Sequence, residues 1–565
     1  MISSFPPGLI MIVGTLLIPF LPHIIRQIYM MVLIIVSAYA LTLGFGIHSK
    51  IEIMDIQFII FQSDALTLPF AIIFHIAAML NVIYGAHEKH WNQHVAIMSY
   101  SGAAIAAVHA GDLLTLFVWW EATAFTSVFL ILASQTQRSY KSAFRYILIQ
   151  VGSGMFLLAG AILLMSETGN AEFKNFDINS LYGQLIFIAF GIKAAFPLLN
   201  GWLQDSYPEA SEIGTVALST FTTKLAIFCF AKSFAGTEIL IIIGAIMTFY
   251  PIFFAVIEND LRRVLTYSLN NQLGFMIVAI GIGTELAING AVAHAFAHIL
   301  YKGLLFMGMG AVLYRVGTCK ASELGGLFQF MPITAICTII GAISISAFPL
   351  FSGFVAKSLI MSALGKEGLV FVYFMLLFAS AGVLHHSGIK IPFFAFFAHE
   401  SGIKTKEAPL NMIIAMIIAS ALCILIGVFP SYFYKILPHQ IQYQPYDFSH
   451  VVGQLQLLTF AAFAFICLWH FKIYPPELNS TVLNSDWIYR KMMPGILLPL
   501  LGLFSDINKK IEQFIVFAFI NIKRFFSDTM TKNKVFDREV GQDTLIVVQL
   551  FTILLIFIFV WKIYL

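Results

Sequence analysis

Charged residues are scarce in this chain. Of its 565 residues, 11% are Asp, Glu, Lys or Arg and 59% are hydrophobic, whereas soluble proteins carry about 25% charged residues. The net charge is only +3, which gives no indication of nucleic-acid binding. The composition therefore excludes an ordinary soluble domain and predicts a chain that lies in the lipid bilayer.

Cysteine motifs and nucleotide-binding motifs are also missing. None of the cysteines forms a CxxC pair, which argues against a disulfide framework, a zinc site or an iron–sulfur cluster. No GxGxxG follows a strand and no P-loop occurs. We therefore expect neither a cofactor nor a metal site. The five cysteines are Cys229, Cys319, Cys337, Cys423 and Cys467.

Long apolar blocks are abundant instead, for example at residues 10–22, 28–46, 65–84 and 545–563. In lipid, such blocks satisfy their backbone hydrogen bonds as helices. We predict an all-α polytopic membrane protein with about 14 to 16 transmembrane helices, each needing about 20 apolar residues. The first block has no basic start and leads straight into a second, so we do not expect it to be a cleavable signal peptide.

Basic residues between the blocks predict the orientation. Arg138, Lys141 and Arg145 lie in one connection, and basic connections face the cytoplasm. Strict alternation then places the N-terminus outside the cytoplasm and further basic residues on the cytoplasmic side. These are Arg26, Lys89, Arg262, Arg263, Arg315 and Lys320.

The blocks and loops divide the chain into four parts. Residues 1–89 are predicted to form three leading helices, and residues 90–235 and 236–430 form two central bundles. Residues 431–565 are an extension in which 507–525 mixes basic residues with Phe and Ile. That mixture is typical of an amphipathic helix on a membrane surface or a partner. A terminal transmembrane helix follows it.

A short pattern recurs in the two central bundles. The letters GIK end at Lys193 and are followed by Pro197, and the same letters end at Lys390 and are followed by Pro392. Proline breaks a helix, and paired broken helices mark a transporter site. We therefore predict that Lys193 and Lys390 occupy equivalent positions on two broken helices, with Lys390 exchanging protons with solvent. Chance similarity of a tripeptide is the alternative.

Three ionisable residues interrupt apolar segments of the first bundle: Glu121, Lys193 and Lys224. A charge inside a membrane span is costly and typically marks an ion or proton pathway. Glu121 and Lys193 are natural partners, because a lysine between burial and a carboxylate can change protonation when its partner moves. The alternatives are a structural ion pair and a lysine that snorkels to the interface.

The second bundle carries His294, His298 and Lys302 at positions i, i+4 and i+8, which share one helix face. Histidine changes charge near neutral pH and therefore suits proton transfer. The alternatives are structural hydrogen bonding and zinc binding, although the glutamate of an HExxH motif is absent.

Other charged residues are less informative. Lys357 follows Pro349 and is expected near a helix end. Asp260, Arg262 and Arg263 lie in one loop and are interpreted as a structural charge cluster at the cytoplasmic edge.

Several motifs together resemble those of a known family. They are the Glu121 helix, KAAFPL at 193–198 with Trp202 and Leu203, DLRRVLTYS at 260–268 and HAFAHILYKGLLF at 294–306. Over residues 60–430 the chain resembles the antiporter-like subunits shared by Mrp-type cation/proton antiporters and the membrane arm of respiratory complex I. It is most similar to the D-type Mrp subunit, through Lys224 and the stretch DWIYR at 486–490. Gln204 departs from the family, which has proline there.

The resemblance implies about 14 core helices with two inverted five-helix repeats that contain broken helices. It also implies partner subunits in a multisubunit complex and a place in a bacterial inner membrane. The implied proton path runs from Glu121 and Lys193 through Lys224, His294, His298 and Lys302 to Lys390.

The expected function is that of a proton-translocating subunit of a cation/proton antiporter, with sodium as the counter-cation. One alternative is a proton-pumping subunit of a complex I-like enzyme or membrane-bound hydrogenase, in which redox chemistry elsewhere drives the same path. Another is a subunit that energises uptake of a solute such as inorganic carbon. The chain itself is not expected to be an enzyme.

Overall fold

The computed structural model describes residues 5–53, 56–474, 477–478, 482 and 487–532. The chain divides into two units, Met1–Asp486 and Trp487–Leu565. The predicted terminal helix at 545–563 lies outside the described residues.

Three helices lead the described part of the first unit. They are α1 (Pro7–Gly14), which continues as a 3-10 helix over Thr15–Phe20, α2 (His23–Ser37) and α3 (Thr67–Tyr84).

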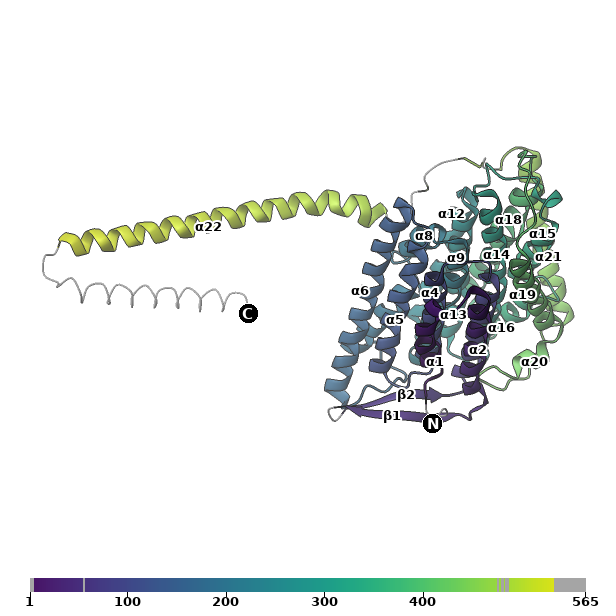
Figure 1. Ribbon diagram of the computed structural model, residues 1–565, viewed down its shortest axis with the longest axis horizontal. Helices are drawn as coiled ribbons and strands as arrows, with labels where there is room; N and C mark the ends of the chain where they lie inside the picture. The colour runs from purple at the N-terminus through teal and green to yellow at the C-terminus, as the bar shows by residue number, and fades with distance from the viewer. Residues whose placement is uncertain (1–4, 54–55, 475–476, 479–481, 483–486, 533–565) are drawn as a thin grey trace. The chain divides into compact units, whose positions relative to one another are not determined.

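An antiparallel hairpin, which the sequence analysis did not predict, joins α2 to α3. Its strands are β1 (Gly46–Ile53) and β2 (Ile56–Ser63). The hairpin lies across one end of the helices (Figure 1). It is held there because the Asp112 carboxylate accepts a hydrogen bond from the backbone N–H of Ile59, at 2.6 Å.

The first central bundle begins with three long helices and ends with two interrupted ones. Asp112 caps the second helix and a capping box starts the third. The bundle contains α4 (Trp91–Val108), α5 (Leu113–Leu132), α6 (Gln137–Thr168), α7 (Leu181–Lys193), α8 (Gly201–Ser206), α9 (Glu212–Thr220) and α10 (Thr222–Ser233).

The second central bundle has a similar order. It contains α11 (Ile239–Phe249), α12 (Pro251–Ile257), α13 (Leu261–Ile282), α14 (Glu285–Val316), α15 (Pro332–Ile345), α16 (Ser352–Lys366), α17 (Val370–Val383) and α18 (Lys390–Pro392). Two π-helical segments, Leu384–Ile389 and Phe393–Phe397, flank α18.

The extension is helical as well. The second bundle ends with α19 (Leu410–Val428), and α20 (Pro430–Tyr434) lies at its boundary with the extension. In the first unit the extension then includes α21 (Phe448–His470). In the second unit, one helix, α22 (Met493–Lys532), contains the whole of residues 507–525. Residues 507–525 are therefore helical, and their placement on a membrane surface or a partner stays a prediction.

The helices make this an integral, multi-pass, all-α membrane protein. Among the described residues, ten helical segments are long and apolar enough to cross a membrane, and three shorter apolar helices accompany them. Burial shows where the centre lies: the most apolar part of α14 is 94% buried and that of α9–α10 is 100% buried, against 11% for α21. The helices α9, α10 and α14 therefore lie at the centre of the protein.

Two helices are broken with the same backbone geometry. In the first break, after α7, Ala195 and Leu198 have φ angles of 59° and 69°. In the second, after α15, Ala347 and Leu350 have φ angles of 58° and 74°. The letters AFPL occupy both breaks. These are the equivalent interruptions of the two bundles.

The predicted equivalence of Lys193 and Lys390 is therefore wrong. Lys193 ends α7 at the first break, but Lys390 begins α18, and the helix continues through Pro392 into a π-helical segment. In π-helical turns the hydrogen bonds run from i to i+5, and such local adjustments accommodate a proline without ending the helix.

Candidate functional site

Lys193 lies fully buried between α5 and α7. Its Nζ donates hydrogen bonds to the Trp120 carbonyl at 2.6 Å and to Thr123 Oγ1 at 3.0 Å. The same ammonium lies 4.2 Å from the centre of the Trp120 ring, a cation–π distance. The ammonium thus has backbone, hydroxyl and aromatic partners from one turn of α5.

Glu121 lies next to that turn, on α5. It interacts electrostatically with Lys193, but its buried Oε1 has no hydrogen-bond partner among the described residues. The space for the carboxylate comes from Gly154 of α6, because a Cβ built there would lie 1.8 Å from Glu121 Oε1. Glu121 and Lys193 are therefore neighbours, and the Glu121 carboxylate is free to accept a further hydrogen bond or a proton.

Lys224 lies at the interruption between α9 and α10. It is fully buried, and its Nζ donates to the Ser219 carbonyl at 2.5 Å. Carbonyls near a helix end have no intrahelical partner, and this one accepts from the ammonium. The break thus provides the oxygen that a buried lysine needs.

Three predicted residues lie together on α14. His294, His298 and Lys302 are all fully buried, and the two imidazole rings are 6.2 Å apart. Within the part of the chain that the structure describes, both nitrogens of His298 and the Nζ of Lys302 lack hydrogen-bond partners. Unpaired buried polar groups are costly, so these atoms have capacity for protons or water.

Tyr301 connects this histidine face to polar residues of α13. Its hydroxyl lies 3.4 Å from His294 Nε2 and donates to Gln272 Oε1 at 3.3 Å. Gln272 Nε2 in turn donates to Asn271 Oδ1 at 2.5 Å. α13 therefore supplies a side-chain hydrogen-bond network beside α14.

Lys357 belongs to the same group, which the sequence analysis underestimated. It lies inside α16 and is 4% exposed. Its Nζ donates to the Ile345 carbonyl, at the second break, at 3.0 Å, and lies 5.0 Å from the centre of the Phe275 ring. It interacts electrostatically with both histidines. The sequence signal was the AFPL motif seven residues upstream.

His386 was missed altogether. It is fully buried in the π-helical segment after α17. Its Nδ1 lies 2.8 Å from Ser387 Oγ, which donates to Ser268 Oγ at 2.8 Å. It interacts with Lys302, Lys357 and Lys390. Two adjacent histidines in an apolar segment were the available signal.

Lys390 ends this series. Its Nζ forms an ion pair with Glu477 Oε1 at 3.0 Å. It also donates to the carbonyls of Val256 at 2.6 Å and Glu258 at 2.7 Å. The acidic partner of Lys390 therefore comes from the C-terminal extension, about 90 residues later in the chain.

The predicted residues thus form two groups. Glu121 interacts with Lys193, whereas Lys224, the α14 residues, Lys357, His386 and Lys390 interact in sequence. α10 lies between the groups, because Lys193 interacts with its Cys229, which is five residues after Lys224. The arrangement is a buried series of groups that can each accept or donate a proton.

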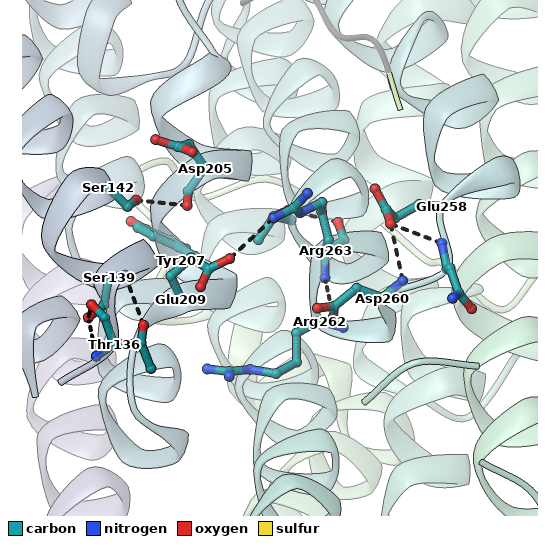
Figure 2. A network of polar contacts seen from close by, with 12 residues as sticks. Thr136, Ser139, Ser142, Asp205, Tyr207, Glu209, Glu258, Asp260, Arg262 and Arg263 are labelled. Atoms are coloured by element: carbon teal, nitrogen blue, oxygen red, sulfur yellow. Dashed lines mark hydrogen bonds and ion pairs between the residues drawn. The ribbon is translucent and has the colours of Figure 1, made fainter. Parts of the chain in front are cut away.

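A charged cluster lies at the start of α13 (Figure 2). Asp260 caps α13 by accepting from the N–H groups of Arg262 and Arg263, and Arg262 donates to the Ala210 carbonyl at 2.7 Å. Arg263 and Glu209 form an ion pair at 3.4 Å. These contacts join the two bundles, in agreement with the structural role predicted for Asp260, Arg262 and Arg263.

Two carboxylates of this cluster have altered acidity. Burial raises the pKa of Glu209 and of Glu258, and Arg263 counteracts the rise at both. Glu258 is 4% exposed, and its Oε1 accepts from the N–H of Asn259 at 2.9 Å. In the described part of the chain, no group of three or more His, Cys, Asp or Glu residues could hold a metal ion.

Comparison with known proteins finds similar membrane subunits. Residues 110–384 match the family described as NADH:quinone oxidoreductase/Mrp antiporter, transmembrane. The D-type subunit of the Na(+)/H(+) antiporter of Alkalihalophilus pseudofirmus is 31% identical over 46% of this chain and 57% of its own length. The NADH-ubiquinone oxidoreductase chain 5 of Hypocrea jecorina is 26% identical over 60% of this chain and 53% of its own.

The fold has a solved counterpart in the Mrp complex from Dietzia sp. DQ12-45-1b. The TM-score is 0.65 at 18% identity, over 76% of this chain and 91% of that one. The chain spans little more than half the length of either curated relative named above.

Proposed function

We propose that this chain, which is related to the antiporter-like membrane subunits of Mrp antiporters and complex I, is the proton-translocating subunit of a multisubunit monovalent cation/proton antiporter. Sodium is the proposed counter-cation, in line with the Na(+)/H(+) antiporter relative. The other subunits of that complex are its proposed partners. Its proposed location is a bacterial inner membrane, with the N-terminus outside the cytoplasm.

One observation carries the proposal: basic groups follow one another through the core, and no acidic residue interacts with the central ones among the residues that the structure describes. Lys224, His298 and Lys302 interact with one another, and Lys302, Lys357 and Lys390 all interact with His386. Like charges that are buried together cannot all be protonated at once. A proton that arrives at one site therefore favours release at the next, which is how a series of this kind moves protons.

The proposed roles follow from the contacts. Glu121 is the switch of the first group, because a change in its protonation or position alters the field at Lys193. His294, His298 and Lys302 are the central carriers, and Lys357 acts with them. Lys390, beside Glu258 and Glu477, is the terminal site.

A second candidate function is a proton-pumping subunit of a complex I-like enzyme. The relative named as NADH-ubiquinone oxidoreductase chain 5 favours it. The same series would then be driven by redox chemistry in another subunit. Identification of the proteins that copurify with the full chain separates the two: redox subunits would support the enzyme and overturn the antiporter.

Cation-driven pH change in everted vesicles tests the proposed function. We expect Lys302→Ala, and the double variant His294→Ala with His298→Ala, to lower the rate by about a hundredfold, the scale of a lost proton-transfer group. The exposed His470→Ala is the matched control. Normal transport by both variants at equal protein level contradicts the proposal. Zinc in wild type that is lost in the double variant would support a metal site instead.

A further inference from the structure

The Lys390 ammonium occupies a cage of oxygen atoms. The segment Ile239–Ile257 ends at α12, where the last carbonyls of a helix have no intrahelical partner. Three carbonyl oxygens from this end accept from Nζ, those of Ala255 at 3.4 Å, Val256 at 2.6 Å and Glu258 at 2.7 Å. The Glu477 carboxylate adds a fourth oxygen at 3.0 Å.

Oxygen cages of this composition can also bind a cation that has lost its hydration shell. Carbonyl oxygens replace the hydration shell of monovalent cations in channels, and carbonyls at helix C-terminal ends coordinate sodium or protons in transporters. An ammonium presents one positive charge to oxygen acceptors, as an alkali cation does. Lys390 therefore stands where such a cation would bind, on a side chain long enough to withdraw.

The charges around the cage determine whether a monovalent or a divalent cation fits it. Glu477 is 7% exposed at its side chain, and a buried carboxylate without a positive partner is strongly unfavourable. Glu258, the other carboxylate that interacts with Lys390, is partly balanced by Arg263. Loss of the Lys390 proton thus leaves one uncompensated charge, which one monovalent cation restores and a divalent cation would exceed.

We propose that this cage, formed by the carbonyls of Val256 and Glu258 with the Glu477 carboxylate, binds one monovalent alkali cation in exchange for the proton of Lys390. The inference rests on the proposed function and names the place where proton and cation compete. The balance is one to one: Lys390 releases H⁺ to water and becomes a neutral amine, and the cation takes its place against Glu477. The titratable and charged groups around the site are Glu258, Asp260, Arg263, His385, His386, Tyr474 and Glu477.

Sodium binding to the full chain, purified with its native partners, tests the cage without transport. We expect binding of radioactive Na⁺ to tighten about tenfold for each pH unit while Lys390 is protonated, because each cation displaces one proton. One proton per sodium should appear in unbuffered solution. Lys390→Ala should remove the pH dependence of this binding, and Glu477→Gln should weaken the binding at least tenfold. Lys366→Ala, at an exposed lysine, should match wild type.

The outcomes separate the cage from the proposed function. Sodium binding without proton release, or equal binding by wild type and Glu477→Gln, overturns the cage while leaving proton transport to be judged by the vesicle assay. If Lys390→Ala does not assemble, proton release by wild type and its loss in Glu477→Gln decide the question. Proton release with intact binding, in a protein that transports no protons, supports the cage and overturns the function.

Discussion

The two helix breaks have the same backbone conformation, but the lysine associated with each break lies on a different side of it in the sequence. At the first, Lys193 is the last residue of the helix that enters the break, α7. At the second, the residue in the matching place is Ile345, and the charge comes from Lys357 on the helix that leaves it. Lys357 reaches the Ile345 carbonyl itself. A lysine is therefore associated with each AFPL break, but from a different position in the sequence: the Lys193 ammonium contacts α5, whereas the Lys357 ammonium contacts the break itself.

The surroundings of the two ammonium groups also differ. Lys193 has Glu121 beside it, whereas Lys357 interacts with the histidines of α14. A carboxylate neighbour stabilises the charged lysine, and basic neighbours oppose it. In the proposed function, the first break would therefore hold a proton and the second would pass it on, although their backbones are alike.

The largest effect is expected when either ammonium is removed. Lys193→Ala and Lys357→Ala should each lower cation-driven proton movement in everted vesicles by about a hundredfold, since each removes a proton-transfer group. Lys366→Ala, on the same helix as Lys357 but exposed, should transport normally. If Lys357→Ala transports as well as wild type, the two breaks are not functionally equivalent.

A smaller effect should follow from crowding Glu121. Gly154→Ala places a methyl group where the carboxylate now lies and should slow transport by about tenfold, because displaced groups transfer protons poorly. Gly152→Ala is the matched control on the same helix, since nothing lies within 4 Å of its Cβ. Equal transport by the two variants would show that the position of Glu121 does not matter.

The strain of the breaks can be compared through their leucines. Leu198 and Leu350 have positive φ angles and are 62% and 55% exposed, so glycine would relieve strain without opening a cavity. Leu198→Gly and Leu350→Gly should each stabilise the purified protein by about 1 kcal/mol, as judged by thermal unfolding. Leu199→Gly, whose φ is not positive, should not. Unequal gains would mean that only one break is strained.

The smallest effect concerns the contact between the bundles. Burial raises the pKa of Glu209, so the folded state binds its proton more tightly than the unfolded state does. Wild type should therefore lose stability relative to Glu209→Gln as the pH rises from the ordinary pKa of glutamate through the raised one. The difference should be about 1 kcal/mol or less, because the site is partly exposed. The exposed Glu167→Gln is the control, and an opposite slope would contradict the raised pKa.

Much of the architecture could be predicted from local sequence. Apolar blocks predicted the three leading helices, and the i, i+4, i+8 spacing predicted the common face of His294, His298 and Lys302. The hairpin at 46–63 was missed because a search for apolar blocks does not detect short alternating strands. His386 and Lys357 were missed or underestimated because neither belongs to a recognisable spacing pattern within its own helix.

The sequence by itself determined that the chain crosses a membrane, that its helices carry ionisable groups and that proline-containing segments interrupt some of them. Hydropathy and residue type are local properties, so they can be read along the chain. Only the tertiary structure decided which groups each buried charged side chain contacts. Lys357 reaches a carbonyl twelve residues earlier, and Lys390 pairs with Glu477 from the extension, because the partners of a buried charge are chosen by proximity in space and not along the sequence.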